Sequence, residues 1–231
     1  MQTVLITGAN RGLGLEFCRQ YADAGWRVLA CCRNPAEAHA LNRLADYYTS
    51  LQVETLDVAD FAQIDALSAR LADAKVDVLI NNAGVYRDTQ DRGFGNLDYQ
   101  AWEMTLRVNT QAPVKMAEAF LPQLERGDNK LIVAISSLMG SMTDNTSGGS
   151  IFYRSSKAAL NAAMKSLAID LNPYSVGVLI FHPGWVRTDM GGPNALINAE
   201  KSVTGMRRSI DGFTLAQSGS FVKYDGSTLP W

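Results

Sequence analysis

The chain has 231 residues, of which 47% are hydrophobic and 19% charged, with a net charge of -2. These values are ordinary for a globular α/β domain with a substantial core. The small net charge argues against a protein that binds nucleic acids or anionic membranes in general. No apolar run reaches the ~18 residues of a membrane span. Because the first predicted strand begins at Thr3 and leaves no room for a cleaved leader, we expect a cytoplasmic protein.

Apolar β-rich runs alternate with helical patterns along the whole chain. We predict strands at Thr3–Thr7, Arg27–Cys31, Gln52–Thr55, Val78–Asn81, Lys130–Ser136 and Val176–Phe181. We predict helices at Leu13–Ala24, Pro35–Tyr47, Phe61–Ala72, Tyr99–Leu124 and Phe152–Leu171. Continuous apolar strands are typical of a parallel sheet buried on both faces, and the alternation implies right-handed crossovers. The sequence therefore predicts a single doubly wound α/β domain over residues 1–231.

The stretch "TGANRGLG" joins the first predicted strand to the first predicted helix. Its glycines are Gly8, Gly12 and Gly14, with the spacing G-x-x-x-G-x-G. A glycine loop alone can be a plain structural turn. At the first turn of a doubly wound sheet, however, a glycine loop lets the backbone approach a dinucleotide diphosphate, and the helix N-terminus offers unpaired N–H groups. The position therefore favours phosphate binding.

The residues after the second predicted strand indicate which dinucleotide is bound. Nicotinamide enzymes of this architecture place a carboxylate there for the adenosine ribose, whereas a 2′-phosphate calls for arginine. Here the strand ends in "VLACCRNP", with Arg33 and no carboxylate, and Arg11 lies inside the glycine loop. Guanidinium groups pair with phosphate oxygens through charge-assisted bonds. Either arginine alone could be a solvated surface residue. The presence of both, with no carboxylate after the strand, favours NADP(H) over NAD(H).

The three cysteines, Cys18, Cys31 and Cys32, do not form a disulfide framework because their number is odd and two of them are adjacent. We expect buried, reduced thiols. No metal site is predicted, since His39 and His182 lie at no suitable interval from these cysteines.

A candidate catalytic pair stands in "YRSSK", where Tyr153 and Lys157 are four residues apart on one helix face. Such a pair is common by chance, so its companions matter. Ser136–Ser137 and the motif "NNAG" (Asn81–Gly84) each end a predicted strand, and Asn109 lies in "VNT". Because ligands of doubly wound sheets bind outside the carboxyl ends of the strands, these motifs predict one site at that edge.

Seven motifs together make the sequence similar to the short-chain dehydrogenase/reductase family. They are "TGANRGLG", "LDV" (Leu56–Val58), "NNAG", "VNT", "ISS", "YRSSK" and "HPGWVRTDMGG" (His182–Gly192), and they run from residue 3 to about residue 192. Within the family, "HPGWVRTDMGG" and "YDGSTLPW" resemble the C-factor or sniffer-type carbonyl-reductase branch. The resemblance implies a Rossmann sheet of seven mostly parallel strands. It also implies hydride transfer between NADP(H) and a small ketone, aldehyde, quinone or alcohol.

The resemblance implies a catalytic tetrad of Asn109, Ser137, Tyr153 and Lys157. Tyr153 is the expected general acid, and Lys157 is expected to lower the pKa of Tyr153 and to bond the nicotinamide ribose. Ser137, preferred to Ser136 on the family pattern, stabilises charge on the substrate oxygen. Asn109 is expected to hold a water that relays the proton onward through Lys157.

The resemblance also implies a set of cofactor-binding residues. They are Gly8, Asn10, Arg11, Gly12, Leu13, Gly14, Arg33, Asp57, Val58, Asn82, Ala83, Gly84, Tyr153, Lys157, Pro183, Gly184, Val186 and Thr188. Among them, Asp57 is expected to accept from the adenine amino group, although a plain turn residue is a real alternative there.

Two segments depart from the family pattern. The loop "TDNTSGGS" (Thr143–Ser150) lengthens the usual interval between Ser137 and Tyr153, and the substrate loop near residues 189–210 is short. We therefore expect an open substrate pocket with apolar walls. The candidates for these walls are Trp185, Met139, Met142 and Tyr86.

Two rival functions stay open beside the reductase. One is a signalling protein of C-factor type that binds NAD(P)(H) with weak catalysis, and the other is a purely structural Rossmann module. The presence of both Tyr153 and Lys157 favours the enzyme, because a sensor needs neither. The resemblance further implies a homodimer or homotetramer, paired through the helices Tyr99–Leu124 and Phe152–Leu171.

Overall fold

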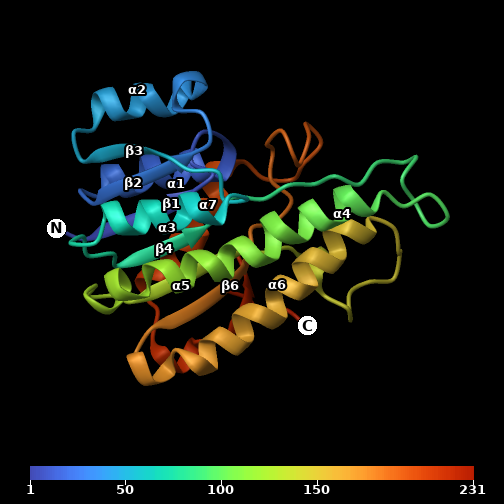
Figure 1. Cartoon of the computed structure of the whole chain (residues 1–231). Helices are drawn as coiled ribbons and strands as arrows, with labels where there is room; N and C mark the ends of the chain where they lie inside the picture. The colour runs from blue at the N-terminus through green and yellow to red at the C-terminus, as the bar shows by residue number, and fades with distance from the viewer.

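The computed structural model describes all residues, 1–231, and contains one sheet of seven strands in the order β3-β2-β1-β4-β5-β6-β7 (Figure 1). The strands are β1 (Thr3–Thr7), β2 (Arg27–Cys32), β3 (Leu51–Thr55), β4 (Val78–Asn81), β5 (Leu131–Ile135), β6 (Gly177–His182) and β7 (Ser220–Lys223). Every neighbouring pair is parallel, which confirms the predicted parallel sheet.

The strand order reverses between β1 and β4. Leu5 of β1 lies between Leu29 of β2 and Leu79 of β4, so the chain winds outward from β1 in both directions. In a sheet of this kind, the loops after the central strands separate at the reversal and leave a crevice for a ligand at the carboxyl edge. The turns after β1, β4 and β5 all meet at this edge.

Helices cover both faces of the sheet (Figure 1). They are α1 (Gly12–Asp23), α2 (His39–Tyr47), α3 (Phe61–Arg70), α4 (Tyr99–Leu106), α5 (Ala112–Glu125), α6 (Ile151–Asp170) and α7 (Ala199–Asp211). One apolar cluster joins α3, α5 and α6 to the sheet through residues such as Phe120 and Met164. A second joins α1, α2 and α7 to the opposite face, through Phe17, Leu41 and Met206. The two layers confirm the doubly wound domain.

Two predicted helices are interrupted. The range Pro35–Tyr47 consists of a short 3₁₀ turn at Pro35–Glu37 and then α2, because Ala38 leaves helical geometry with φ −84° and ψ 51°. The range Tyr99–Leu124 contains five π-helical residues, Arg107–Gln111, between α4 and α5. Pro113 follows this segment at the start of α5, where its missing N–H is tolerated.

The region predicted as a short substrate loop near residues 189–210 differs in its second half. The structure has α7 there, beginning at Ala199 and capped by the side chain of Asn198, which accepts from the Lys201 N–H. Its buried side chains Val203, Met206 and Ile210 recur at helical spacing and pack toward α1. Their helical spacing is present in the sequence. The strand β7 is absent from the six strand ranges predicted from the sequence.

All three cysteines are buried and unpaired, and burial raises the pKa of the Cys18 and Cys31 thiols. No helix has both the length and the apolar character that crossing a bilayer requires. No three His, Cys, Asp or Glu side chains are grouped so that they could hold a metal ion.

Candidate active site

The glycine-rich turn after β1 is tightly folded against its surroundings. Gly8 and Gly12 have φ of 65° and 54°, the left-handed region that favours glycine. A Cβ on Gly14 would lie 2.1 Å from the carbonyl oxygen of Gly8, so only glycine fits there. No side chain caps the start of α1, which leaves its first N–H groups free to bind an anion. The turn thus fits the diphosphate of a dinucleotide.

The "NNAG" motif after β4 supports this turn from the neighbouring strand. The Asn82 side chain donates to the carbonyl oxygens of Thr7 and Gly8 at 2.9 and 3.0 Å. The Thr7 hydroxyl in turn accepts from the N–H groups of Asn82 and Ala83. The side-chain amide of Asn82 therefore holds the glycine-rich turn, and a cofactor contact of the Asn82 backbone stays a prediction.

Tyr153 and Lys157 lie one turn apart near the start of α6, and both are almost completely buried. The Lys157 ammonium donates to the carbonyl oxygen of Ile135, the last residue of β5, at 2.8 Å. Its nitrogen is 5.6 Å from the centre of the Tyr153 ring. The bond to β5 fixes the lysine at the carboxyl edge of the sheet, beside the phenol.

Burial dominates the pKa values of both Tyr153 and Lys157. Burial raises the pKa of Tyr153 to about 12, while the neighbouring Ser137 hydroxyl acts to lower it. Burial also lowers the pKa of Lys157 to about 8. Burial is the larger effect in this geometry, because a buried phenolate is costly. A lowering of the Tyr153 pKa by Lys157 stays a prediction.

The two serines after β5 have different surroundings. The Ser136 hydroxyl donates to the buried Asn161 side chain at 2.6 Å and faces the interior. The Ser137 hydroxyl accepts from the Met139 N–H at 3.1 Å and lies beside the Tyr153 phenol. The structure thus brings Ser137 together with Tyr153 and gives Ser136 a role in packing, a distinction that spacing alone did not make.

Asn109 lies in the π-helical segment and is fully buried. Its side chain accepts from the Val85 N–H and donates both to the Val85 carbonyl oxygen and to the Ser156 hydroxyl. Both amide hydrogens are thereby used, so the side chain joins the segment after β4 to α6. The role expected for Asn109, to hold a water that relays the proton, stays a prediction.

Gly84 lies where these groups converge. A Cβ placed on it would be 3.4 Å from the Asn109 amide oxygen and 3.7 Å from the Lys157 nitrogen. Gly140, in the turn after Ser137, packs so closely on α6 that a Cβ would be 2.8 Å from the carbonyl carbon of Lys157. The strand ends of β4 and β5 are therefore held directly against the helix that carries the tyrosine.

At the expected adenosine end, Arg33 is exposed directly after β2. Asp57 follows β3, the neighbouring strand, and one of its carboxylate oxygens accepts from the Ala59 N–H at 2.9 Å. Asp57 thus forms a turn, and its other oxygen stays available. Val58 is buried in the apolar core, so only its backbone can reach a nucleotide at this edge.

At the expected nicotinamide end, the chain after β6 folds back on itself. Val186 is buried and pairs with Ile197, so its side chain points into the protein. The Pro183 carbonyl oxygen accepts from the Ser202 hydroxyl of α7 at 2.6 Å. The methyl group of Thr188 is 3.2 Å from the position of a Cβ on Gly12. The loop after β6 therefore contacts the glycine-rich turn at Gly12.

Two side chains near the site had no sequence signal that pointed to them. Asp189 forms an ion pair with Arg11 at 2.8 Å, and Asp88 accepts from two N–H groups at the start of α6. Both contacts join segments that are far apart in the chain.

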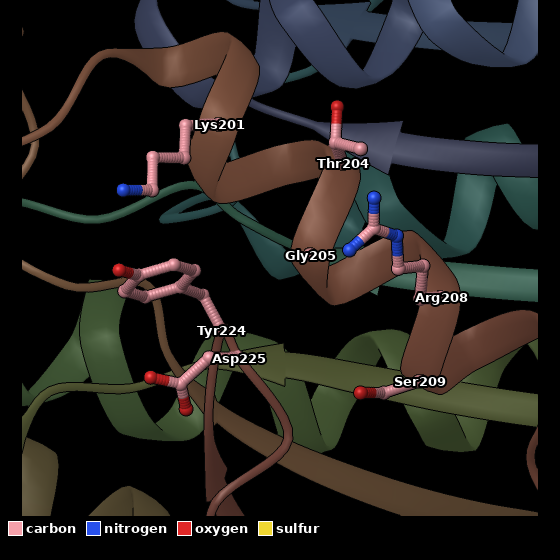
Figure 2. A pocket seen from close by; sticks show the side chains of 7 residues that line it. All are labelled: Lys201, Thr204, Gly205, Arg208, Ser209, Tyr224 and Asp225. Atoms are coloured by element: carbon pink, nitrogen blue, oxygen red, sulfur yellow. The ribbon is translucent and has the colours of Figure 1, made fainter.

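Two surface hollows away from this site do not gather comparable chemistry. Figure 2 shows a cavity of about 530 Å³ between α7 and the turn after β7. Its two cations, Lys201 and Arg208, point in different directions and do not converge on one point (Figure 2). A second hollow of about 280 Å³ is lined by Tyr99, Trp102, Glu103 and Leu106 on the outside of α4.

Comparison with known proteins agrees with this geometry. The family model described as short chain dehydrogenase matches residues 2–196, so the chain belongs to the short-chain dehydrogenase/reductase family. It is an oxidoreductase by family, with the Rossmann fold of that class.

Three relatives show which members of the family the chain is similar to. The chain is 43% identical over 166 residues to the C-signal of Myxococcus xanthus, covering 72% of this chain and 99% of that protein. It is 35% identical to the carbonyl reductase Sniffer of D. melanogaster, with a TM-score of 0.91 and full coverage of both chains. An NADPH-bound carbonyl reductase from chicken fatty liver is 32% identical, with a TM-score of 0.93 over 100% of this chain and 99% of that one.

Proposed function

We propose that this protein is an NADP(H)-dependent carbonyl reductase that transfers hydride reversibly between the nicotinamide and a carbonyl or alcohol carbon. One observation carries the proposal: a buried Tyr153, with Ser137 and Lys157 beside it, lies at the same sheet edge as a glycine-rich turn shaped for a dinucleotide. The solved relatives described as carbonyl reductases, one of them with NADPH bound, support this assignment.

The chain's own residues supply the proton and the charge stabilisation. When bound, NADPH supplies the hydride that reduces the carbonyl carbon. Tyr153 donates the proton to the carbonyl oxygen, and a pKa of about 12 means that it holds this proton at neutral pH. Ser137 donates a hydrogen bond to the same oxygen as negative charge develops. Lys157 keeps an ammonium beside the phenol and can replace the proton through a water on the Asn109 carbonyl.

Arg33 and the glycine-rich turn support NADP(H) as the cofactor. Arg33 is exposed and no hydrogen bond or ion pair engages its guanidinium, so it is free to pair with a 2′-phosphate. Arg11 is engaged with Asp189 and contributes less to this recognition.

The exposed apolar side chains around the site support small ketones, aldehydes or quinones as substrates. Trp185, Met142 and Tyr86 are 51%, 76% and 44% exposed, respectively. They offer apolar surface without a charged group, which suits substrates whose only polar atom is the carbonyl oxygen.

The test is NADPH consumption over a panel of aromatic ketones, aldehydes and quinones, together with the Kd values for NADPH and NADH. We expect turnover with NADPH and an NADPH affinity at least about tenfold above that for NADH, the worth of one charge-assisted phosphate contact. Equal affinity for both nucleotides would refute the cofactor assignment. Absence of turnover on the whole panel would refute the reductase.

A second candidate function is a signalling protein whose nucleotide occupancy acts as a switch. The 43% identity to the C-signal of Myxococcus xanthus favours it. The same measurements separate the two functions, because tight NADPH binding without turnover on any carbonyl supports the sensor. A homodimer or homotetramer and a cytoplasmic location stay predictions, which size-exclusion chromatography and cell fractionation test.

A further inference from the structure

The first turn of α6, which carries Tyr153, has no cap from its own neighbourhood. Ser150 precedes the helix in a left-handed conformation, φ 45° and ψ 46°, and its side chain makes no capping bond. The helices α3, α4 and α7, in contrast, are capped by the side chains of Asp60, Asp98 and Asn198 at their own N-termini. A helix start without acceptors frays, because its first N–H groups have no intrahelical partners.

Asp88 supplies the missing acceptors from a distant part of the chain. It lies in the segment between β4 and α4, 64 residues before Phe152. One of its carboxylate oxygens accepts from the Phe152 N–H and the other from the Tyr153 N–H, both at 2.9 Å. Its negative charge also lies at the positive end of the helix dipole, which adds to the attraction.

Other contacts also join the segment between β4 and α4, and α4 itself, to the start of α6. The Tyr86 hydroxyl lies 2.7 Å from the Ser150 hydroxyl, and the Tyr86 ring is centred 5.0 Å from the Tyr153 ring. Trp102 of α4 donates to the Ser155 hydroxyl at 2.8 Å and stacks on Phe152. Asp88 is the member of this set that bonds the backbone of Tyr153 itself.

The geometry points to Asp88 as a positioning residue for the proton donor Tyr153, an inference that rests on the proposed reductase function. Lys157 is anchored independently by its bond to Ile135 of β5. Without Asp88, the Tyr153 backbone loosens while Lys157 stays in place, and the phenol loses its alignment with the substrate oxygen. A displacement of ~1 Å at a reacting group costs up to about a hundredfold in rate.

The test compares Asp88→Ala with Asp60→Ala in the full-length protein. Asp60 accepts from the Ala62 and Gln63 N–H groups at the start of α3, so its loss removes the cap of a helix that carries neither Tyr153 nor Lys157. We expect Asp88→Ala to lower kcat for NADPH-dependent carbonyl reduction at least about tenfold, with the NADPH Kd within about twofold of wild type. Asp60→Ala should shift Tm comparably and leave kcat unchanged. Asp88→Asn, which keeps one acceptor oxygen, should recover part of kcat.

The outcomes separate this inference from the proposed function. An active wild type with unchanged kcat in both Asp88 variants overturns the positioning role alone. Equal loss of kcat in Asp88→Ala and Asp60→Ala also overturns it, because the effect would then be general destabilisation. A wild type that binds NADPH but reduces no carbonyl overturns the proposed function and this role with it. If Asp88→Ala fails to fold, the kcat of Asp88→Asn against that of Asp60→Asn decides the question.

Discussion

Arg11 and Asp189 form an ion pair of 2.8 Å that joins the glycine-rich turn to the loop after β6, across 178 residues of sequence. Both side chains are largely exposed, so the pair contributes little to stability. The ion pair instead fixes the direction of the Arg11 side chain. The Arg11 guanidinium points to the loop at the nicotinamide end, whereas the sequence predicts that it helps to hold a 2′-phosphate.

Arg33 should therefore dominate the preference for NADPH. We expect Arg33→Ala to weaken NADPH binding by about 10- to 100-fold, the worth of one or two charge-assisted hydrogen bonds, and to leave NADH binding unchanged. Arg11→Ala should have a smaller effect on the NADPH Kd. Fluorescence titration with both nucleotides measures this, and an equal loss for NADPH and NADH in Arg33→Ala would contradict it.

The phenol of Tyr153 should be needed for turnover and not for cofactor binding. Tyr153→Phe removes the proton donor, and we expect kcat to fall by about 10²–10⁴ with little change in the NADPH Kd. Tyr21→Phe is the matched control, because the Tyr21 hydroxyl is buried in α1 without a hydrogen-bond partner. Retained turnover in Tyr153→Phe would remove the tyrosine from the mechanism.

The rate of carbonyl reduction should fall as the pH rises through about 8, the pKa that burial gives Lys157. Above that value the lysine loses the positive charge that assists proton replacement at Tyr153. Burial raises the pKa of Tyr153 to about 12, so the phenol does not set this limb of the profile. The measurement is kcat/KM between pH 6 and about pH 10. A flat profile over this range would show that the Lys157 charge is not required.

Gly14→Ala should disrupt the dinucleotide turn. Its Cβ would lie 2.1 Å from a backbone oxygen, that of Gly8, which cannot rotate away. We expect a loss of unfolding free energy of about 1–3 kcal/mol and loss of NADPH binding. Gly93→Ala is the control, since a Cβ there meets nothing within 4 Å. Chemical denaturation and nucleotide titration check both variants, and normal NADPH binding by Gly14→Ala would count against the turn as the diphosphate site.

His182 should make the fold sensitive to acid. Burial and the Lys223 charge lower the pKa of His182 from 6.5 to about 4. Between these values the unfolded chain binds a proton that the folded chain does not, so the unfolding free energy falls as pH falls, by roughly 2–3 kcal/mol. Urea unfolding between pH 7 and 4 should show a shallower loss in His182→Gln than in His39→Gln. An identical slope in both variants would assign the acid sensitivity to other groups.

Local sequence was enough for the features that lie within one short segment. The glycine spacing of residues 8–14, the pair Tyr153 and Lys157 on one helix face, and the apolar strands that imply a parallel sheet are all of this kind. The family and the doubly wound fold followed from them and are confirmed.

Only the tertiary structure decided what depends on burial and on partners from distant segments. The pKa of Tyr153 rises because the phenol is enclosed, and enclosure is a property of the packed fold. The Asn109 side chain is committed to Val85 and Ser156, and the start of α6 depends on Asp88. These contacts cross 24 to 65 residues of chain. Hydrogen bonds and desolvation act over a few ångströms in space, so linear spacing cannot specify them.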